Sequence, residues 1–215
     1  MYRFLPAQTK AFMQPNANEE MIDQPLYHFQ SYGTSGATSF TFFQTTIGSA
    51  TNGLSDTNME QAGALSLGKK MAVLSVSVHF IPSAPQVNNA GASTASALND
   101  IKKVIEGIGA LQLTILNKPY LQVAPLSALP AGQGIYTSGA SYQATQASGA
   151  AGDGFIAYGT NGMPLPSARY QLCTPLPIPS QVSFNVVITF PTAITVTTAS
   201  RIGVYLWGPQ IRAMQ

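Results

Sequence analysis

The stretch from Lys70 to Ile81, KMAVLSVSVHFI, decides the fold class of this chain. Side chains of a strand alternate between the two faces of a sheet. Two sets follow here: Met71, Val73, Ser75, Ser77 and His79 on one face, and Leu74, Val76, Val78 and Phe80 on the other. Pro82 ends the run, because proline has no N–H to donate to a sheet. The stretch therefore predicts a long β-strand.

Working outward from this strand, similar short runs lie along most of the chain. They are rich in Val, Ile, Thr and aromatic residues, and they cover 38–47, 111–116, 120–126, 154–158, 170–176, 181–190 and 201–207, the last continued by 210–212. About eight short strands separated by turn residues are typical of a sandwich or a barrel. We therefore expect an all-β chain that folds as a β-sandwich.

The remaining segments are predicted to lie outside the sheets. Residues 96–108 place apolar side chains on one helical face and are expected to form one short α-helix. Residues 1–26 contain three prolines without a persistent period and are expected to form an extended N-terminal arm, with residues 27–215 as one domain. Loop excursions are expected near 83–110 and 131–153, because both stretches hold small and polar residues.

Charged residues are scarce. Only 8% of the 215 residues are Asp, Glu, Lys or Arg, whereas about 25% is usual for a soluble domain. A protein with so neutral a surface tends to associate, and interface centres are depleted of charge. We expect a subunit covered by copies of itself; the alternative is a secreted adhesin or lectin of low charge.

The distribution of the few charges argues against nucleic acid as a partner. The net charge is +2, and the basic residues gather only as the pairs Lys69-Lys70 and Lys102-Lys103. Proteins that bind nucleic acid carry a basic patch or arm, so no such binding is expected. The sequence also shows neither a secretory signal pattern nor an apolar run of membrane-spanning length. Synthesis in a cytoplasm is therefore expected.

Side chains that perform catalysis or bind metals are sparse and dispersed. The two histidines, His28 and His79, are far apart in the sequence, and no G-x-S-x-G or phosphate-loop motif is present. The lone Cys173 is expected to be a small buried side chain. Residues 56–60 are expected to cap a turn, with a bound cation as the alternative. The chain is therefore expected to be no enzyme and to hold no cofactor or metal.

Two segments resemble capsid proteins of tailless icosahedral bacteriophages. They are Asp56 to Gly63 with the strand that follows through Ile81, and the end of the chain from Ser183 to Ile188 and from Gly203 to Gly208. The order of strands and helix resembles a viral jelly roll, two four-stranded sheets packed face to face. The absence of a basic arm favours a single jelly roll from the shell of a DNA phage.

The resemblance implies a structural virion protein. Such a protein is a self-assembling capsid subunit of an icosahedral shell, put together in the host cytoplasm. Its partners would be copies of itself and other virion proteins at vertices or minor positions, and the shell can overlie an internal membrane. The alternative is a spike, fibre or lectin-like module that binds glycans. An enzyme on a jelly-roll scaffold would need a histidine cluster, which the sequence lacks.

Candidate interface residues lie in three regions of the chain. The arm supplies Phe4, Phe12 and Met13, the 131–153 loop Tyr136 and Tyr142, and the C-terminal region Trp207 and Arg212. Trp207 is expected to be an anchor in the core or between subunits, with stacking on a sugar as the alternative.

Overall fold

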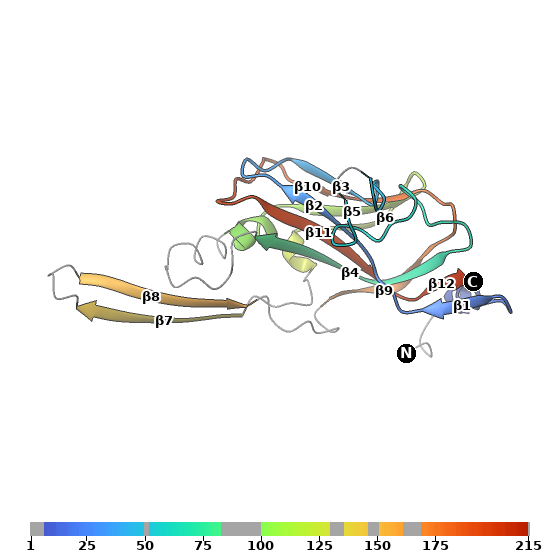
Figure 1. Cartoon of the computed structure of the whole chain (residues 1–215), viewed down its shortest axis with the longest axis horizontal. Coiled ribbons are helices and arrows are strands. Elements are labelled where there is room, and N and C mark those ends of the chain that lie inside the picture. Colours follow the sequence, from blue (N-terminus) through green and yellow to red (C-terminus); the bar gives the residue numbers. More distant parts are fainter. Residues whose placement is uncertain are drawn as a thin grey trace.

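The computed structural model describes residues 7–49, 52–82, 100–129, 136–145, 151–160 and 169–214. Two antiparallel sheets face each other across one core, as Figure 1 shows. The prediction of an all-β sandwich is therefore confirmed.

The larger sheet has six strands, arranged around the long strand β4. Its order is β1 (Glu19–Ile22), β12 (Gln210–Ala213), β4 (Lys70–Pro82), β11 (Ser200–Trp207) and β2 (Leu26–Tyr32), and β9 (Tyr170–Ile178) also pairs with β4. The smaller sheet has four strands in the order β3 (Ser39–Phe42), β10 (Phe184–Thr189), β5 (Ala110–Ile115) and β6 (Lys118–Val123).

Strand pairing in the sandwich is nested. Leaving aside the edge pair of β1 with β12, β2 pairs with β11; β3 pairs with β10, β4 with β9, and β5 with β6. All four pairs are antiparallel. The nested order therefore brings segments that are far apart in the sequence side by side.

An irregularity in the pairing changes the faces of β4. Between Val73 and Ser75 its register against β9 is interrupted, and the partner moves from Leu176 to Gln171. Met71 and Val73 share the core with Val76, Val78 and Phe80. The prediction that strict alternation continues through the strand was wrong, because the two faces are exchanged at this irregularity.

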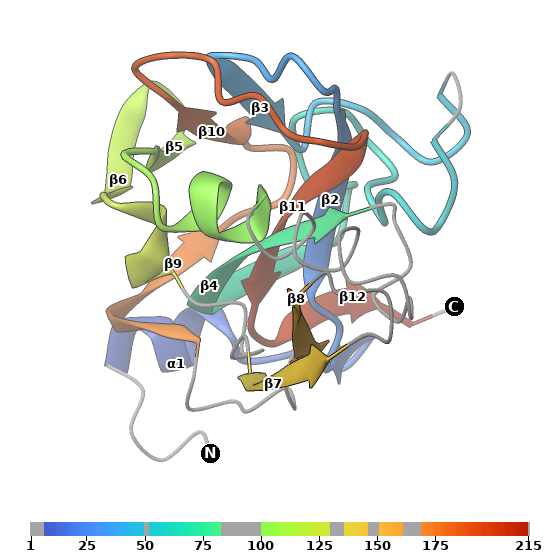
Figure 2. The same cartoon turned by 90° about the vertical axis from the view of Figure 1, so that its left-hand side faces the viewer.

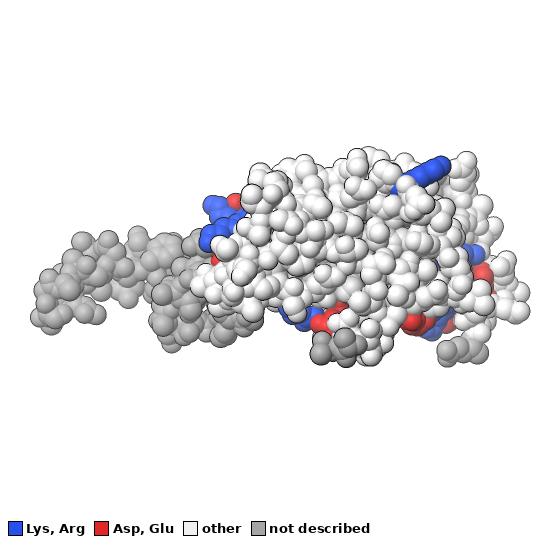
Figure 3. Space-filling view, turned by 90° about the horizontal axis from the view of Figure 1, so that it is seen from above, with Lys and Arg blue, Asp and Glu red and all other residues white. Residues whose placement is uncertain are grey.

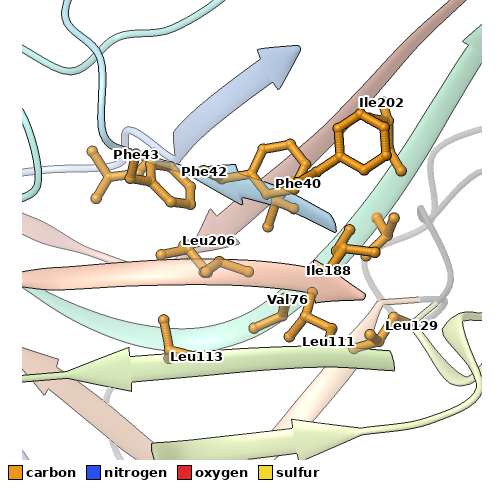
Figure 4. Packing of buried hydrophobic residues seen from close by; sticks show 14 of the residues in the cluster. Phe40, Phe42, Phe43, Val76, Leu111, Leu113, Leu129, Ile188, Ile202 and Leu206 are labelled. Atoms are coloured by element: carbon orange, nitrogen blue, oxygen red, sulfur yellow. The ribbon is translucent and has the colours of Figure 1, made fainter. Parts of the chain in front are cut away.

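Both sheets contribute to a single large core. Figure 4 shows Phe40 and Phe42 of β3, Ile188 of β10, and Leu111 and Leu113 of β5 facing side chains of the larger sheet. The helix predicted at 96–108 is confirmed where the chain is described, at 100–105. Its Ile101 and Val104 are buried in this core, and Figure 2 looks onto the end of the sandwich that the helix covers.

The N-terminal segment differs from the irregular arm that was predicted. Residues 7–12 form helix α1 (Ala7–Phe12), and β1 is an edge strand of the larger sheet, paired with β12. Met13 packs against Ala72 and Ile211 of that sheet. The described part of the arm therefore belongs to the domain, because its few apolar side chains bury themselves on the chain's own sheet.

Two further elements also depart from the prediction. Strand β2 was missed, because aromatic or apolar residues fall on both of its faces and hide the alternation. The expected loop at 131–153 contains β7 (Tyr136–Thr145), which pairs with β8 (Ala151–Thr160) as a separate two-stranded sheet. A short 3-10 helix, η2 (Leu126–Ala128), follows β6.

We predict that Leu113→Ala lowers the free energy of unfolding by about 2–5 kcal/mol, because it leaves a cavity in the centre of the core. Leu113 is 0% exposed. Leu67→Ala removes the same atoms from a side chain that is 84% exposed, and it should change stability by less than about 0.5 kcal/mol. Urea unfolding of both variants checks this; equal losses would contradict the packing described.

Candidate functional site

The outer face of the larger sheet carries a cluster of aromatic rings. The ring of Tyr205 lies 5.5 Å from that of Tyr27, 5.6 Å from Phe29 and 4.7 Å from His79, measured between centroids. Gly203 makes room for this cluster, because a Cβ there would lie 2.2 Å from Cδ1 of Phe29. The rings therefore pack on one another and on the strands beneath them.

Trp207 extends this cluster, and other side chains contact both its indole ring and its N–H. Its indole stacks on Tyr205 with centroids 5.0 Å apart and planes inclined by 15°. The guanidinium carbon of Arg169 lies 3.4 Å from the indole centroid, a cation–π contact. Trp207 Nε1 donates to Ser77 Oγ at 2.9 Å. Little of the indole is left for a sugar to stack upon, so the geometry favours the anchoring role.

The two histidines are buried in different surroundings. His79 Nε2 lies 3.1 Å from Ser77 Oγ on the outer face, and burial lowers the pKa of His79 to about 4, with the nearby Arg169 adding to the effect. His28 Nδ1 accepts from the backbone N–H of Phe43. Burial also lowers the pKa of His28 to about 4, against the attraction of Asp56. Both imidazoles are therefore neutral at pH 7.

Both carboxylate oxygens of Asp56 bind groups of the chain itself. One carboxylate oxygen accepts from the backbone N–H of Gly53 at 2.9 Å, and the other pairs with the guanidinium of Arg201. Thr57 Oγ1 accepts from the N–H of Met59 at 3.1 Å, which is the turn capping that the sequence predicted. An open pocket of about 420 Å³ lies beside this pair and His28. Among the residues described, no three of His, Cys, Asp and Glu gather as a metal site.

The outer face of the smaller sheet has a different character. We call it the neutral face and define it by residues Ser39 and Thr41 of β3, Ala110, Gln112 and Thr114 of β5, Gln122 of β6, and Asn185, Val187 and Thr189 of β10. None of these residues is buried, and none is charged. The four strands of this sheet contain one charged residue, Lys118 at the start of β6.

Register aligns the neutral face into cross-strand rows. Thr41 pairs with Val187, Val187 with Gln112, and Gln112 with Gln122. The amide of Gln122 donates to Gln112 Oε1 at 3.4 Å. A shallow hollow of about 270 Å³ opens between the β5–β6 pair and the end of β10. Figure 3 looks down on the side where Figure 1 places β3 and β10, and most of that surface carries no charged side chain.

The candidate interface residues of the arm have different positions. Phe4 lies outside the described residues. Phe12 is half-buried, with Lys70 Nζ 6.0 Å from its ring centroid. Met13 is only 3% exposed, so it is occupied by the chain's own sheet and offers a neighbour almost no surface. Met13 was chosen as a residue of the expected arm, and the sequence did not reveal that α1 brings it onto the sheet.

The remaining candidates are also dispersed. The side chains of Tyr136 and Tyr142 lie outside the described part of the structure, although their backbone forms β7. Arg212 is half-buried and pairs with Glu20 at 2.6 Å. Cys173 is exposed, which corrects the expectation that it is buried: β9 borders the sheet, and this residue faces away from the core. The candidates therefore do not form one site.

Comparison with known proteins gives no match: no protein-family model, no curated protein and no solved structure resembles the chain significantly. No helix among the described residues has the length and apolarity needed to cross a membrane.

The neutral face is the feature that the sequence analysis missed. Its signal was present, since alternate positions of 110–115 and 184–189 are uncharged and lie between buried residues.

We predict that the fold loses stability between pH 7 and pH 5. Both histidines have a folded pKa of about 4 against an ordinary value of 6.5, so the unfolded chain takes up protons first as the pH falls. Each contributes at most about 2 kcal/mol by pH 5. Urea unfolding at pH 7, 6 and 5 measures the loss. His79→Gln should remove about half of the slope, and a flat profile for the wild type would refute the assignment.

We also predict that Arg169 shields Trp207. Trp207 is the only tryptophan, so its fluorescence reports on this contact directly. Arg169→Ala should raise quenching by acrylamide and shift emission to longer wavelength, because water replaces the guanidinium. Arg212→Ala serves as the matched control and should leave the emission unchanged. If adding soluble glycans changes the fluorescence emission of the wild type, the indole is accessible to sugars. In that case the shielding described here is wrong.

Proposed function

We propose that this chain is a structural virion protein, a capsid subunit that assembles with copies of itself into an icosahedral shell. The neutral face carries this proposal. It is one whole side of the sandwich, it is open to solvent, and its residues are Thr, Gln, Asn, Ser, Ala and Val. Such a face has the composition of a surface that another protein covers.

The physical reason is the cost of removing groups from water. An unpaired charge that loses its water costs several kcal/mol, whereas a hydroxyl or amide that regains a hydrogen bond costs little. A sheet without charges can therefore be buried and released with small changes in free energy. A shell sums many such modest contacts over identical copies, and a closed symmetric arrangement satisfies them all.

The nested strand pairing supports the same proposal. Eight strands pair in nested order, from β2 with β11 through to β5 with β6, and a nested order is what we expect of a hairpin rolled into a jelly roll. Jelly rolls serve in viral capsid and lectin domains. Between these two uses, the engaged indole of Trp207 weakens the glycan-binding alternative. Copies of the chain, with other virion proteins, are the proposed partners.

The test is assembly of the purified chain, followed by light scattering and negative-stain microscopy over a range of concentration and salt. Closed particles of uniform size are expected. Thr189→Lys with Gln122→Lys, which we call the face variant, places two charges on the neutral face and should reduce assembly at least tenfold. Both positions are exposed, so folding should be retained.

The control variant combines Ser31→Lys with Thr195→Lys, which adds the same charge at exposed positions away from the neutral face. It should assemble like the wild type. A wild-type chain that stays monomeric under every condition would overturn the proposed function. Equal assembly of the face variant and the wild type would show that the neutral face is not the contact surface.

A further inference from the structure

Leu67 is the most exposed large apolar side chain in the described part of the chain, at 84%. It lies at the tip of a tight turn formed by residues 66–69, which we call the leucine turn. The N–H of Lys69 donates to the carbonyl of Ser66 at 3.0 Å. Gly68 occupies the third position with a φ of +80°, which glycine adopts without strain and which is typical of a type II turn.

The leucine turn is fixed to the rest of the sandwich. The hydroxyl of Ser180 donates to the carbonyl of Ser66 at 3.0 Å and accepts from the N–H of Gly68 at 3.1 Å. Ser66 Oγ donates to Glu60 at 2.7 Å, and Lys69 pairs with the same carboxylate, so the two charges beside the turn neutralise each other. Because the backbone of the turn is already ordered, little conformational entropy is lost when the leucine is buried against another surface.

The hollow on the neutral face has the size and composition to hold one apolar side chain. Its volume of about 270 Å³ is several times the roughly 30 Å³ that one water molecule occupies in the liquid. None of its eight lining residues is charged; they include Ala110, Val123 and Val187 beside Gln112, Gln122 and Thr189. The centres of protein interfaces are likewise depleted of charge. An aliphatic side chain therefore enters the hollow without leaving a charge unpaired.

The leucine turn and the hollow lie at opposite ends of β10. Ala64, two residues before the turn, bridges to Ser183, the residue before the strand begins. The hollow includes Thr189, where the strand ends. Six residues of a strand extend about 20 Å, so Leu67 cannot reach the hollow of its own chain. A leucine turn occupies this hollow only if it belongs to a neighbouring copy.

We propose that the leucine turn of one copy inserts Leu67 into the hollow on the neutral face of a second copy. This inference rests on the proposed function, because it names a contact by which subunits join. The turn presents one ordered apolar side chain beside charges that are already paired, and the hollow receives it among uncharged groups. Both halves of the contact are present in every copy of the chain.

A contact of this kind is heterologous, because it joins two unlike surfaces. Each copy gives one leucine turn and receives another at the opposite end of β10. Such contacts close into rings or shells when the rotation between copies closes, and they continue as open filaments when it does not. Burial of one leucine strengthens each contact by roughly tenfold in association constant, which is a modest gain that a shell repeats over all its subunits.

The first experiment changes the leucine without disturbing the fold. Leu67→Ala should leave the free energy of unfolding nearly unchanged, because the side chain is exposed in the monomer. It should nevertheless raise the concentration needed for assembly by at least about tenfold. Leu67→Asp, which we call the turn variant, should be monomeric where the wild type assembles, because an unpaired carboxylate would lose its water in the hollow. Light scattering and urea unfolding measure the two effects.

Leu54→Asp is the matched control. Leu54 is 68% exposed and lies in a different turn, so the same substitution there adds the same charge away from the proposed contact. This variant should assemble like the wild type. Equal loss of assembly in Leu54→Asp and in the turn variant would refute the contact, because the position of the leucine would then make no difference.

Complementation tests whether Leu67 meets the hollow. The face variant keeps Leu67 but has a blocked hollow, since Gln122 and Thr189 line it, and the turn variant keeps an open hollow. Each alone should be monomeric, whereas their mixture should form a one-to-one complex that analytical ultracentrifugation detects. Adding Leu67→Ala to the face variant removes the remaining leucine from the mixture and should weaken this complex by at least about tenfold.

The outcomes separate this inference from the proposed function. If the wild type forms shells and the turn variant assembles equally well, the contact is wrong and the capsid role stands. If neither variant assembles alone and their mixture gives no one-to-one complex, the contact is likewise refuted. If the wild type does not assemble, the proposed function itself fails. A one-to-one complex that depends on Leu67 in one partner and on an open hollow in the other supports the inference in either case.

Discussion

Strand β4 is the constraint on which the rest of the structure depends. It has neighbours on both edges, β11 and β12 on one and β9 on the other, and both of its faces are buried along most of its length. Its inward side chains therefore have to be apolar, and its outward ones have to find partners within the protein. Ser77 meets this demand by joining Trp207 and His79. The irregularity between Val73 and Ser75 lets one strand meet both requirements with a single change of face.

Elements with a strong local period could be predicted from the sequence. The long strand at 70–81, the strands near 184–189 and 200–207, and the helix at 100–105 all carry such a pattern. The local sequence period does not predict the structure where contacts between distant segments determine which side chains are buried. Leu26–Tyr32 is aromatic on both faces because it lies between the core and the outer ring cluster. The neutral face could not be located, because it exists only once four distant segments lie side by side.

The two outer faces of the sandwich differ in how far their side chains are covered by other groups of the chain. On the larger sheet, aromatic rings cover one another and arginines lie over Trp207 and Phe29, so the apolar area is already satisfied within the chain. On the smaller sheet, hydroxyl and amide groups face outward, and Gln112 is hydrogen-bonded to Thr114 and Gln122. The first face is finished in the monomer. The second remains open to solvent.

The nested pairing of strands also sets the order of events during synthesis. The central strand β11 follows ten of the other strands in the sequence, yet β2 and β4 both need it as a neighbour. The larger sheet cannot be completed before β11 has been synthesised, whereas the smaller sheet needs only segments up to β10. A chain cut before Ser200 therefore lacks the strand that joins β2 to β4, and the apolar side chains of both strands stay without cover.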